Sequence, residues 1–336
     1  MKTLLYIGNK LSKHGINVST IETLGPLLEK EGFNVIMSSS KNNPILRLLD
    51  MIFDTFINSK KVDFVLIDTY STLNFWYAFI ISQCCRLLKI KYIPILHGGN
   101  LPNRIKKNPF LSGLLFNNSY INITPSGYLL HYLKEFHIQN VKQIPNTISV
   151  FEYNHDLRNS VKPKLLWVRA FASIYNPEMA LKVFSKLKKI YPDAELCMVG
   201  PYKDMSKEVV QQLIEKNKVD IKLSGRLTKA EWTQLSKKYD IFINTTHFDN
   251  TPVSVIEAMA LGLPIVSTNV GGIPFLLEDR ENALLVNDSD VDEMVKSITE
   301  LIENPELARK LSVNGRKEAE QFDWNVVKNQ WKEILK

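Results

Sequence analysis

The chain has 336 residues, of which 45% are hydrophobic and 23% charged, a balance that predicts a folded protein of two domains and excludes a disordered chain, a collagen or a coiled coil. Its three cysteines (Cys84, Cys85 and Cys197) have no spacing typical of disulfide frameworks or zinc sites, so a reducing, cytoplasmic setting is expected. The net charge of +7 lies wholly in residues 1–155, which hold 16 Lys and Arg against 9 Asp and Glu, while residues 156–336 hold 26 of each.

The first half of the chain alternates short apolar runs with longer segments of helical periodicity. Strands are expected at 3–7, 33–38, 62–67, 91–96 and 119–123, and helices at 18–31, 44–58, 72–88 and 126–136. Pro26 falls inside the first of these helices, where a proline removes a backbone donor. The polar stretch 145–163 has weak periodicity and is the expected linker.

The second half has the same alternation with clearer helix signals. Strands are expected at 164–169, 195–200, 220–224, 240–244 and 264–267, with helices beginning near 176, 206, 228 and 251 and a last helical stretch over 291–336. Thr228 and Glu231 have the spacing of a capping box. Thr251 is expected to cap a helix with Pro252 at its first position.

Apolar strands that alternate with helices predict an α/β fold with parallel sheets buried on both faces. We predict two Rossmann-like, doubly wound domains that face each other across a cleft, over residues 1–155 and 156–320, followed by a C-terminal helix over 321–336. Ligands bind such sheets beyond the carboxyl ends of the strands. The loops that follow the strands of both halves are therefore the expected site.

Residues 247–264 carry the strongest site signal. They follow an expected strand and open a helix, whose first amides and dipole favour an anion. Asp249 lies in the loop before the helix, and Glu257 lies about 1.5 turns inside it. Glu257 is either a binding group in the cleft or a surface side chain on the outer face, and the pattern alone leaves both open.

This segment resembles the E-x7-E region of glycosyltransferase family 4, a large family of GT-B fold, with Asp249 and Glu257 at the two acidic positions. The continuation 257–274 matches the family's usual run almost residue for residue. The resemblance extends over about 164–335, and residues 322–324 (Phe-Asp-Trp) are similar to the family's terminal helix, which crosses back onto the first domain. In the first half it rests on the Gly15 loop, His97-Gly98-Gly99, Pro125-Ser126-Gly127 and Pro145-Asn146.

The resemblance implies transfer of a hexose-type sugar, with retention of configuration, from a UDP- or GDP-sugar to a glycan or lipid-linked acceptor. It implies a hexosyltransferase without cofactor or bound metal, acting in bacterial surface polysaccharide synthesis. By position, it implies that Glu257 holds the ribose, Asp249 and amides near Asn250 and Thr251 the donor sugar, and amides near Val253 and Ser254 the diphosphate. It likewise implies that Arg169 binds the phosphates and that the loop at Gly15 comes close to them. It also implies that backbone groups of the Arg226-Leu227 turn contact the base and that His97 faces the sugar.

Elementary chemistry agrees with parts of this assignment. A departing nucleoside diphosphate gains negative charge, which Arg169 and a helix N-terminus would stabilise most in the transition state. Retaining glycosidases hold two carboxyl groups about 5–5.5 Å apart, and Asp249 and Glu257 lie too far apart along the helix for that, so we expect them to bind. The family's usual lysine after the phosphate arginine is missing from 169–176. Either another cation replaces it, or the protein is a non-catalytic member of the fold that binds a sugar or a partner.

Several weaker signals have two interpretations. Arg104, Lys106 and Lys107 are either a solvated loop or a contact for an anionic acceptor or lipid headgroup. The aromatic stretch 73–82 is either core or a peripheral membrane contact. The basic half would also suit nucleic acid, but no nucleic-acid motif is present and none is expected to bind. Asp288 and Asp290 resemble a metal-binding D-x-D, but two acidic helix caps explain them, and we expect no metal.

Overall fold

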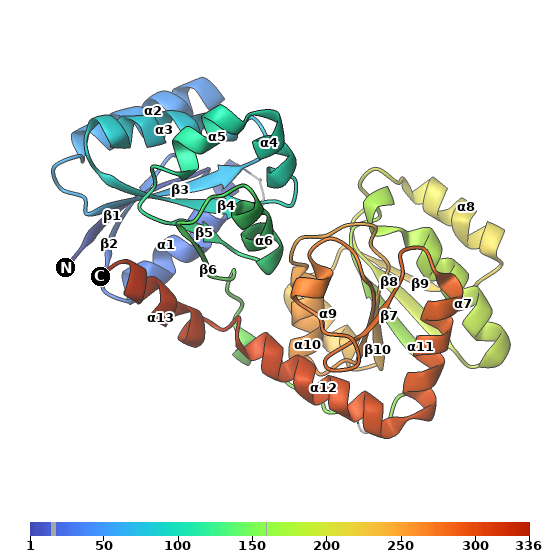
Figure 1. Ribbon diagram of the computed structural model, residues 1–336. Helices are drawn as coiled ribbons and strands as arrows, with labels where there is room; N and C mark the ends of the chain where they lie inside the picture. The colour runs from blue at the N-terminus through green and yellow to red at the C-terminus, as the bar shows by residue number, and fades with distance from the viewer. Residues whose placement is uncertain (15–17, 159) are drawn as a thin grey trace. The chain divides into compact units, whose positions relative to one another are not determined.

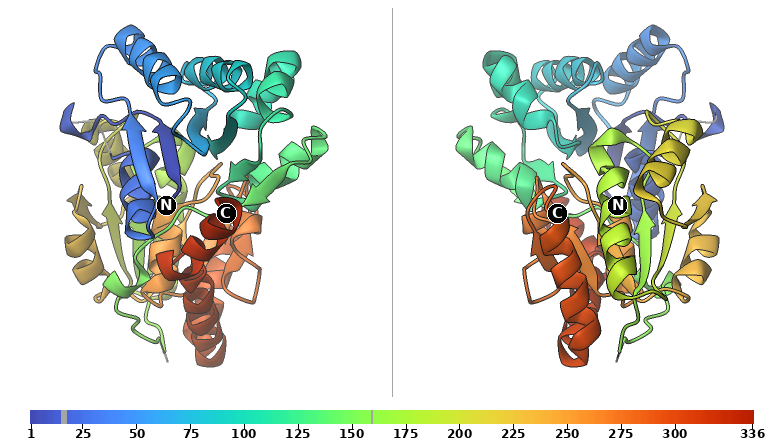
Figure 2. Two further views of the ribbon diagram at one scale, coloured as in Figure 1. Left: turned by 90° about the vertical axis from the view of Figure 1, so that its left-hand side faces the viewer. Right: turned by 90° about the vertical axis from the view of Figure 1, so that its right-hand side faces the viewer.

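The computed structural model describes residues 1–14, 18–158 and 160–336, so Gly15 lies outside the described residues. The chain divides into two compact units, one of residues 1–146 with 327–336 and one of residues 147–326. Each unit contains a six-stranded parallel sheet with helices on both faces (Figures 1 and 2). The predicted α/β, doubly wound architecture is therefore confirmed for each unit.

The first unit has the strand order β2-β1-β3-β4-β5-β6. Its strands are β1 Thr3–Ile7, β2 Asn34–Ser38, β3 Phe64–Tyr70, β4 Lys91–His97, β5 Asn122–Thr124 and β6 Val141–Gln143. Its helices are α1 Thr20–Lys30, α2 Pro44–Ile57, α3 Phe75–Leu87, α4 Leu101–Lys107, α5 Pro109–Phe116, α6 Gly127–Glu135 and the last part of α13 Trp324–Ile334. Helices α2, α3 and α5 cover one face of the sheet, and α1 and α6 the other (Figure 1). The order reverses between β1 and β3, which is where doubly wound sheets bind ligands.

The expected elements of the first half are present, with Pro26 inside α1. Three short elements were not predicted: α4, α5 and β6. Each has three to eight residues, too few for a periodic pattern. Arg104, Lys106 and Lys107 consequently lie on a helix, and the loop interpretation of this stretch is wrong.

The second unit has the strand order β12-β11-β10-β7-β8-β9. Its strands are β7 Lys164–Val168, β8 Glu195–Val199, β9 Lys222–Gly225, β10 Ile241–Asn244, β11 Ile265–Thr268 and β12 Leu284–Val286. Its helices are α7 Pro177–Ile190, α8 Lys207–Asn217, α9 Lys229–Ser236, α10 Val253–Ala260, α11 Val291–Glu303, α12 Pro305–Glu320 and the start of α13. This order is that of a Rossmann sheet, and it reverses between β7 and β10.

Helix starts in the second unit follow the local sequence closely. The Thr228 hydroxyl accepts the Glu231 amide, and the Glu231 carboxylate accepts the Thr228 amide, so the predicted capping box is confirmed. The prediction for Thr251 is wrong by one residue. Pro252 has an extended backbone (φ −73°, ψ 112°) and holds the cap position, so α10 begins at Val253.

The division between the units falls after Asn146, earlier than the predicted boundary after residue 155. Within the second unit, the Ile148 amide donates to the Phe322 carbonyl (2.9 Å), and the Val150 amide donates to the Asp323 carboxylate (3.0 Å). These bonds tie residues 147–153 to the chain just before α13. Along the described part of the chain, no helix is both long and apolar enough to cross a bilayer.

Candidate functional site

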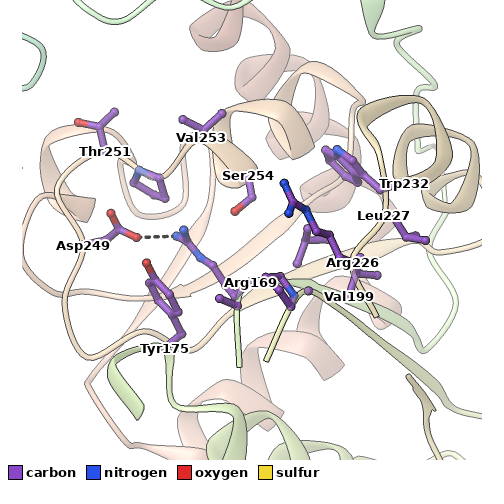
Figure 3. A pocket seen from close by; sticks show the side chains of 15 residues that line it. Arg169, Tyr175, Val199, Arg226, Leu227, Trp232, Asp249, Thr251, Val253 and Ser254 are labelled. Carbon is purple, nitrogen blue, oxygen red and sulfur yellow. Dashed lines mark ion pairs between the residues drawn. The ribbon is translucent and has the colours of Figure 1, made fainter. Parts of the chain in front are cut away.

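A pocket of about 470 Å³ lies at the carboxyl ends of four neighbouring strands of the second unit (Figure 3). Arg169 lines the pocket after β7, Gly200 after β8 and Arg226 after β9. Asp249, in the loop after β10, and Ser254, at the start of α10, complete its polar lining. The pocket therefore spans the point where the strand order reverses, the position that this topology favours for ligands.

Most of the residues predicted for this unit come together in the pocket. Those that line it are Arg169, Arg226, Leu227, Asp249, Thr251, Val253 and Ser254. Two predicted residues, Asn250 and Glu257, are not part of its lining. The sequence thus identified the loops of the pocket, although it could not give the contacts within them.

Arg169 is held in one orientation by three side chains. Its guanidinium forms an ion pair with Asp249, with 2.8 Å between Nη2 and Oδ2, and its Nε donates to the Asn244 amide oxygen at 3.3 Å. The Tyr175 ring lies beneath it, 5.0 Å from Cζ. The Arg169 and Asp249 side chains are only 10% and 17% exposed. A fixed, partly desolvated cation of this kind suits an anionic ligand.

Three glycines allow the loops around Arg169 to approach each other closely. A Cβ on Gly272 would lie 1.8 Å from the Asn250 carbonyl oxygen, and one on Gly200 would lie 1.7 Å from the Arg169 carbonyl oxygen. Gly271 has φ +55°, and a Cβ there would lie 2.5 Å from the Asp249 carbonyl oxygen. Any other residue at these positions would displace the loops that carry Arg169 and Asp249.

The first turn of α10 faces the pocket. The first amides of a helix have no acceptor within it, and the helix dipole adds positive potential there. Ser254 projects into the pocket from this turn (Figure 3), and its buried hydroxyl has no hydrogen-bond partner among the described residues. This turn supplies donors for an anion.

Arg226 contributes a second guanidinium to the pocket. Its exposed side chain extends towards the first turn of α10 (Figure 3). Within the described part of the chain, no residue forms an ion pair or hydrogen bond with this guanidinium. The resemblance gave this turn a backbone role only, so the free cationic side chain is a feature that the sequence comparison missed.

Glu257 lies on α10 about one turn after Ser254 and is partly buried. The Tyr153 hydroxyl donates to its carboxylate. Lys229 lies over the Tyr153 ring (4.6 Å from its centroid) and pairs with Glu152 at 2.9 Å. Burial raises the pKa of the Glu257 carboxyl, and the Tyr153 hydrogen bond and Lys229 act in the opposite direction. Glu257 is therefore a held, inward carboxylate and not a free side chain on the outer face.

In the first unit, His97 belongs to a buried polar cluster that the sequence did not reveal. His97 ends β4, and its Nε2 donates to Asp68 of β3 at 2.9 Å, where the carboxylate is the acceptor. The Tyr6 hydroxyl donates to the same Asp68 oxygen at 3.0 Å, and the Tyr70 ring stacks on His97 with centroids 4.8 Å apart. Asp68 is fully buried, and burial together with this carboxylate raises the pKa of Tyr6. His97 is thus held in one orientation.

The remaining basic candidates of the first unit have different environments. Arg104 packs its guanidinium over the rings of Phe75 (4.5 Å to the centroid) and Trp76 (5.4 Å) in α3. Lys106 and Lys107 are exposed on α4. Arg104 therefore stabilises the packing of α4 on α3, and only the two lysines face solvent.

The Asp288–Asp290 segment agrees with its expected role only in part. Asp290 caps α11 by accepting the Glu293 amide at 2.9 Å. Asp288 is not a cap, because it accepts from His247 Nδ1 at 2.8 Å. Among the described residues, no group of three or more His, Cys, Asp or Glu could hold a metal ion.

The fold defined by the two sheets is the GT-B fold of glycosyltransferases. Among solved structures, HepE from Anabaena in complex with UDP aligns with a TM-score of 0.77 over 100% of this chain and 99% of that chain, at 16% identity. HepE has also been solved in complex with UDP-glucose. Residues 153–318, almost all of the second unit, match the family model of glycosyl transferases group 1.

Two curated relatives are named as glycosyltransferases. An uncharacterized glycosyltransferase of Haemophilus influenzae is 29% identical over 203 residues, which are 60% of this chain and 57% of the relative. A second one, from Methanocaldococcus jannaschii, is 26% identical over 247 residues, which are 70% of this chain and 66% of the relative. The match thus spans less than two thirds of the length of either relative.

Proposed function

We propose that the protein is a retaining glycosyltransferase that moves a hexose-type sugar from a UDP- or GDP-sugar to a glycan or lipid-linked acceptor. The observation that carries this proposal is the pocket in which Arg169, Arg226 and the first turn of α10 surround one cavity. Two guanidinium groups and free helix amides form a site for a diphosphate. The group 1 family match and the nucleotide complexes of HepE support a nucleotide sugar as the donor.

Departure of the nucleoside diphosphate is the step that the pocket assists. Negative charge builds on the phosphate oxygens as the glycosidic bond breaks, and prepositioned donors stabilise that charge most in the transition state. Arg169 is prepositioned by Asn244, Asp249 and Tyr175. Arg226 and the N-terminus of α10 leave the lining net positive after Arg169 pairs with Asp249, so we propose a reaction that needs neither metal nor cofactor.

Arg226 is a candidate for the second phosphate cation, which the sequence lacks after Arg169. The segment after Arg169 has no second cation, but Arg226 lines the same pocket from the end of β9. We assign Arg226 the role of the second phosphate cation, while the backbone of the turn with Leu227 contacts the base.

The two acidic residues hold the donor in this proposal. Asp249 binds donor-sugar hydroxyls while its other contact fixes Arg169. Glu257 accepts the ribose hydroxyls beside its bond to Tyr153. Both carboxylates are already engaged, because Glu257 accepts from the Tyr153 hydroxyl and Asp249 pairs with Arg169 and accepts the Asn250 amide, which supports a retaining transfer without a covalent intermediate.

The first unit is proposed to hold the acceptor. His97, fixed by Asp68, would contact the transferred sugar, and the loop at Gly15 would approach the phosphates. Lys106 and Lys107 would meet an anionic or lipid-linked acceptor. We propose that the reaction takes place in the cytoplasm, during synthesis of a bacterial surface polysaccharide and in peripheral contact with the membrane.

Thermal unfolding against a panel of nucleotides and nucleotide sugars tests the donor site. A ligand at 100 times its dissociation constant adds about 2.7 kcal/mol of stability, a shift of several degrees for domains of this size. Glu257→Ala should abolish the shift, whereas Glu215→Ala, an exposed carboxylate on α8, should keep it. If no nucleotide stabilises the wild type, or Glu257→Ala keeps the full shift, the site assignment is wrong.

A non-catalytic sugar- or partner-binding protein of the same fold is the second candidate. The missing lysine favours it. Both candidates predict nucleotide binding, but only the transferase predicts release of the nucleoside diphosphate. Turnover or slow hydrolysis of the stabilising donor by purified protein separates them.

A further inference from the structure

Helix α2 presents a continuous row of large apolar side chains to solvent. These six side chains, between 43% and 70% exposed, are Ile45, Leu46, Leu49, Phe53, Phe56 and Ile57. At 100° per residue they fall within about one third of the helix circumference. Single exposed apolar residues are common on proteins, but a contiguous apolar face of this kind marks an interaction surface. We call these six residues the α2 face.

The side of α2 that packs against the protein carries buried polar side chains among apolar ones. Arg47 and Thr55 are buried there beside Met51. The Arg47 guanidinium donates to the carbonyl oxygens of Lys41 and Asn42 at 2.8 and 3.0 Å, and the Thr55 hydroxyl donates to the Met51 carbonyl. A helix on a protein surface normally buries its apolar side and exposes its polar side. The orientation of α2 is therefore partly inverted, because the helix buries two polar side chains and exposes six large apolar ones.

Neighbouring helices of the same layer add further apolar groups. Helices α2, α3 and α5 cover one face of the first sheet (Figures 1 and 2). Leu73, Trp76 and Phe110, on or next to α3 and α5, are 84%, 42% and 74% exposed. Half of the aromatic stretch 73–82 is buried core, including Phe75 and Tyr77, so the main apolar surface lies on α2 and not in this stretch.

The charge of the unit that carries the α2 face is strongly positive. Residues 1–146 with 327–336 hold 19 Lys and Arg against 9 Asp and Glu, a net charge of +10, whereas residues 147–326 hold 23 against 26, a net charge of −3. Exposed lysines flank both ends of α2, at Lys41 and at Lys60 and Lys61. The two acidic residues of the helix, Asp50 and Asp54, are half-buried, and Asp50 accepts from the Ser39 hydroxyl.

We propose that the α2 face docks this protein on an anionic lipid leaflet. Its apolar side chains enter the boundary between headgroups and acyl chains, and the flanking lysines contact anionic headgroups. A second copy of the chain is a poorer partner, because it would bring two units of +10 together at this face. This inference rests on the membrane contact of the proposed function and names its surface, and it can be tested apart from the donor site, since no residue of the α2 face lines that pocket.

Vesicle flotation of the full-length protein tests the docking. Vesicles of phosphatidylcholine are compared with vesicles that also contain ~30 mol% phosphatidylglycerol. The wild type should bind the anionic vesicles at least ~10-fold more tightly, and less tightly at high salt. Leu49→Gln/Phe53→Gln should lose this binding at least ~10-fold while keeping its melting temperature. The matched control is Ile190→Gln/Val209→Gln, which removes two exposed apolar side chains (53% and 41% exposed) from the second unit and should bind like the wild type.

Several results would overturn the proposal. One is a wild type that does not float with anionic vesicles, or that floats equally with neutral ones. Another is a Leu49→Gln/Phe53→Gln variant that binds as well as the wild type. Light scattering that shows a wild-type dimer, dissociated by the same substitutions without any vesicle binding, would assign the face to a second copy of the chain. The nucleotide-induced thermal shift, measured on each variant, keeps this outcome separate from failure of the donor site.

Discussion

Replacing Arg226 by alanine removes one of the two guanidinium groups that line the proposed donor pocket. Among the described residues none pairs with it, so the substitution breaks no internal ion pair. Arg169, by contrast, supports Asp249, Asn244 and Tyr175, and its removal would disturb the loop itself. Arg226 is therefore the cleaner test of the diphosphate site.

The size of the effect follows from the exposure of the side chain. A hydrogen bond to a charged partner contributes about 1.5–3 kcal/mol, and the solvent-exposed position of Arg226 places it at the lower end. We expect Arg226→Ala to weaken UDP or GDP binding by roughly 10-fold, since 1.36 kcal/mol corresponds to a factor of ten. Because negative charge grows as the diphosphate departs, kcat/KM should fall further, by roughly 10- to 100-fold.

Calorimetric titration with the nucleoside diphosphate and with the bare nucleoside separates a phosphate role from a base role. Arg226→Ala should weaken the diphosphate and leave the nucleoside unchanged, and Arg226→Lys should recover part of the loss because it keeps the charge. Arg309→Ala, an exposed arginine on α12, is the control. Equal losses for nucleoside and diphosphate, or unchanged diphosphate binding, would refute the phosphate role.

Three further substitutions test other parts of the site. Glu257→Gln should raise the melting temperature at neutral pH, because burial raises the pKa of this carboxyl and its ionisation costs stability. This gain should shrink as the pH falls through the raised pKa, and thermal unfolding measured at several pH values tests this. Asp68→Asn should lower kcat and leave donor affinity unchanged, because His97 loses the carboxylate that orients it. Steady-state kinetics measures kcat and titration measures donor affinity, and equal losses of kcat and of donor affinity would contradict this prediction. Gly272→Ala should abolish donor binding, since its Cβ would lie 1.8 Å from a carbonyl oxygen of the loop before α10. Gly315→Ala should keep donor binding, because its Cβ would lie 3.5 Å from the nearest neighbouring atom. Titration of both variants with the donor tests this prediction.

Local signals in the sequence were sufficient for much of the fold. The capping box at Thr228 depends on residues that are three positions apart, and the apolar composition of the strands predicts them directly. The short elements α4, α5, β6 and β12 were missed because a few residues carry no period. Thr251 was placed one residue too early because a proline can stand at the cap as well as at the first helical position.

Contacts between distant residues were beyond the reach of the sequence. The ion pair between Arg169 and Asp249 joins the ends of β7 and β10, and the bond between Asp68 and His97 joins two other neighbouring strands. The order of the strands in each sheet brings these pairs together, and local sequence patterns do not predict that order. The partly inverted orientation of α2 is similar, because amphipathic periodicity shows that a helix has two faces but not which of them the protein buries.

The charge of the donor pocket depends on Arg226. Three charged side chains line the pocket within the described part of the chain, and two of them, Arg169 and Asp249, pair with each other. That pair alone is neutral, and its carboxylate would repel an incoming diphosphate. The dipole of α10 adds only about half a positive charge. Arg226 makes the lining net positive, so in the proposed function, with no second cation after β7, it is the group that we expect to attract the diphosphate.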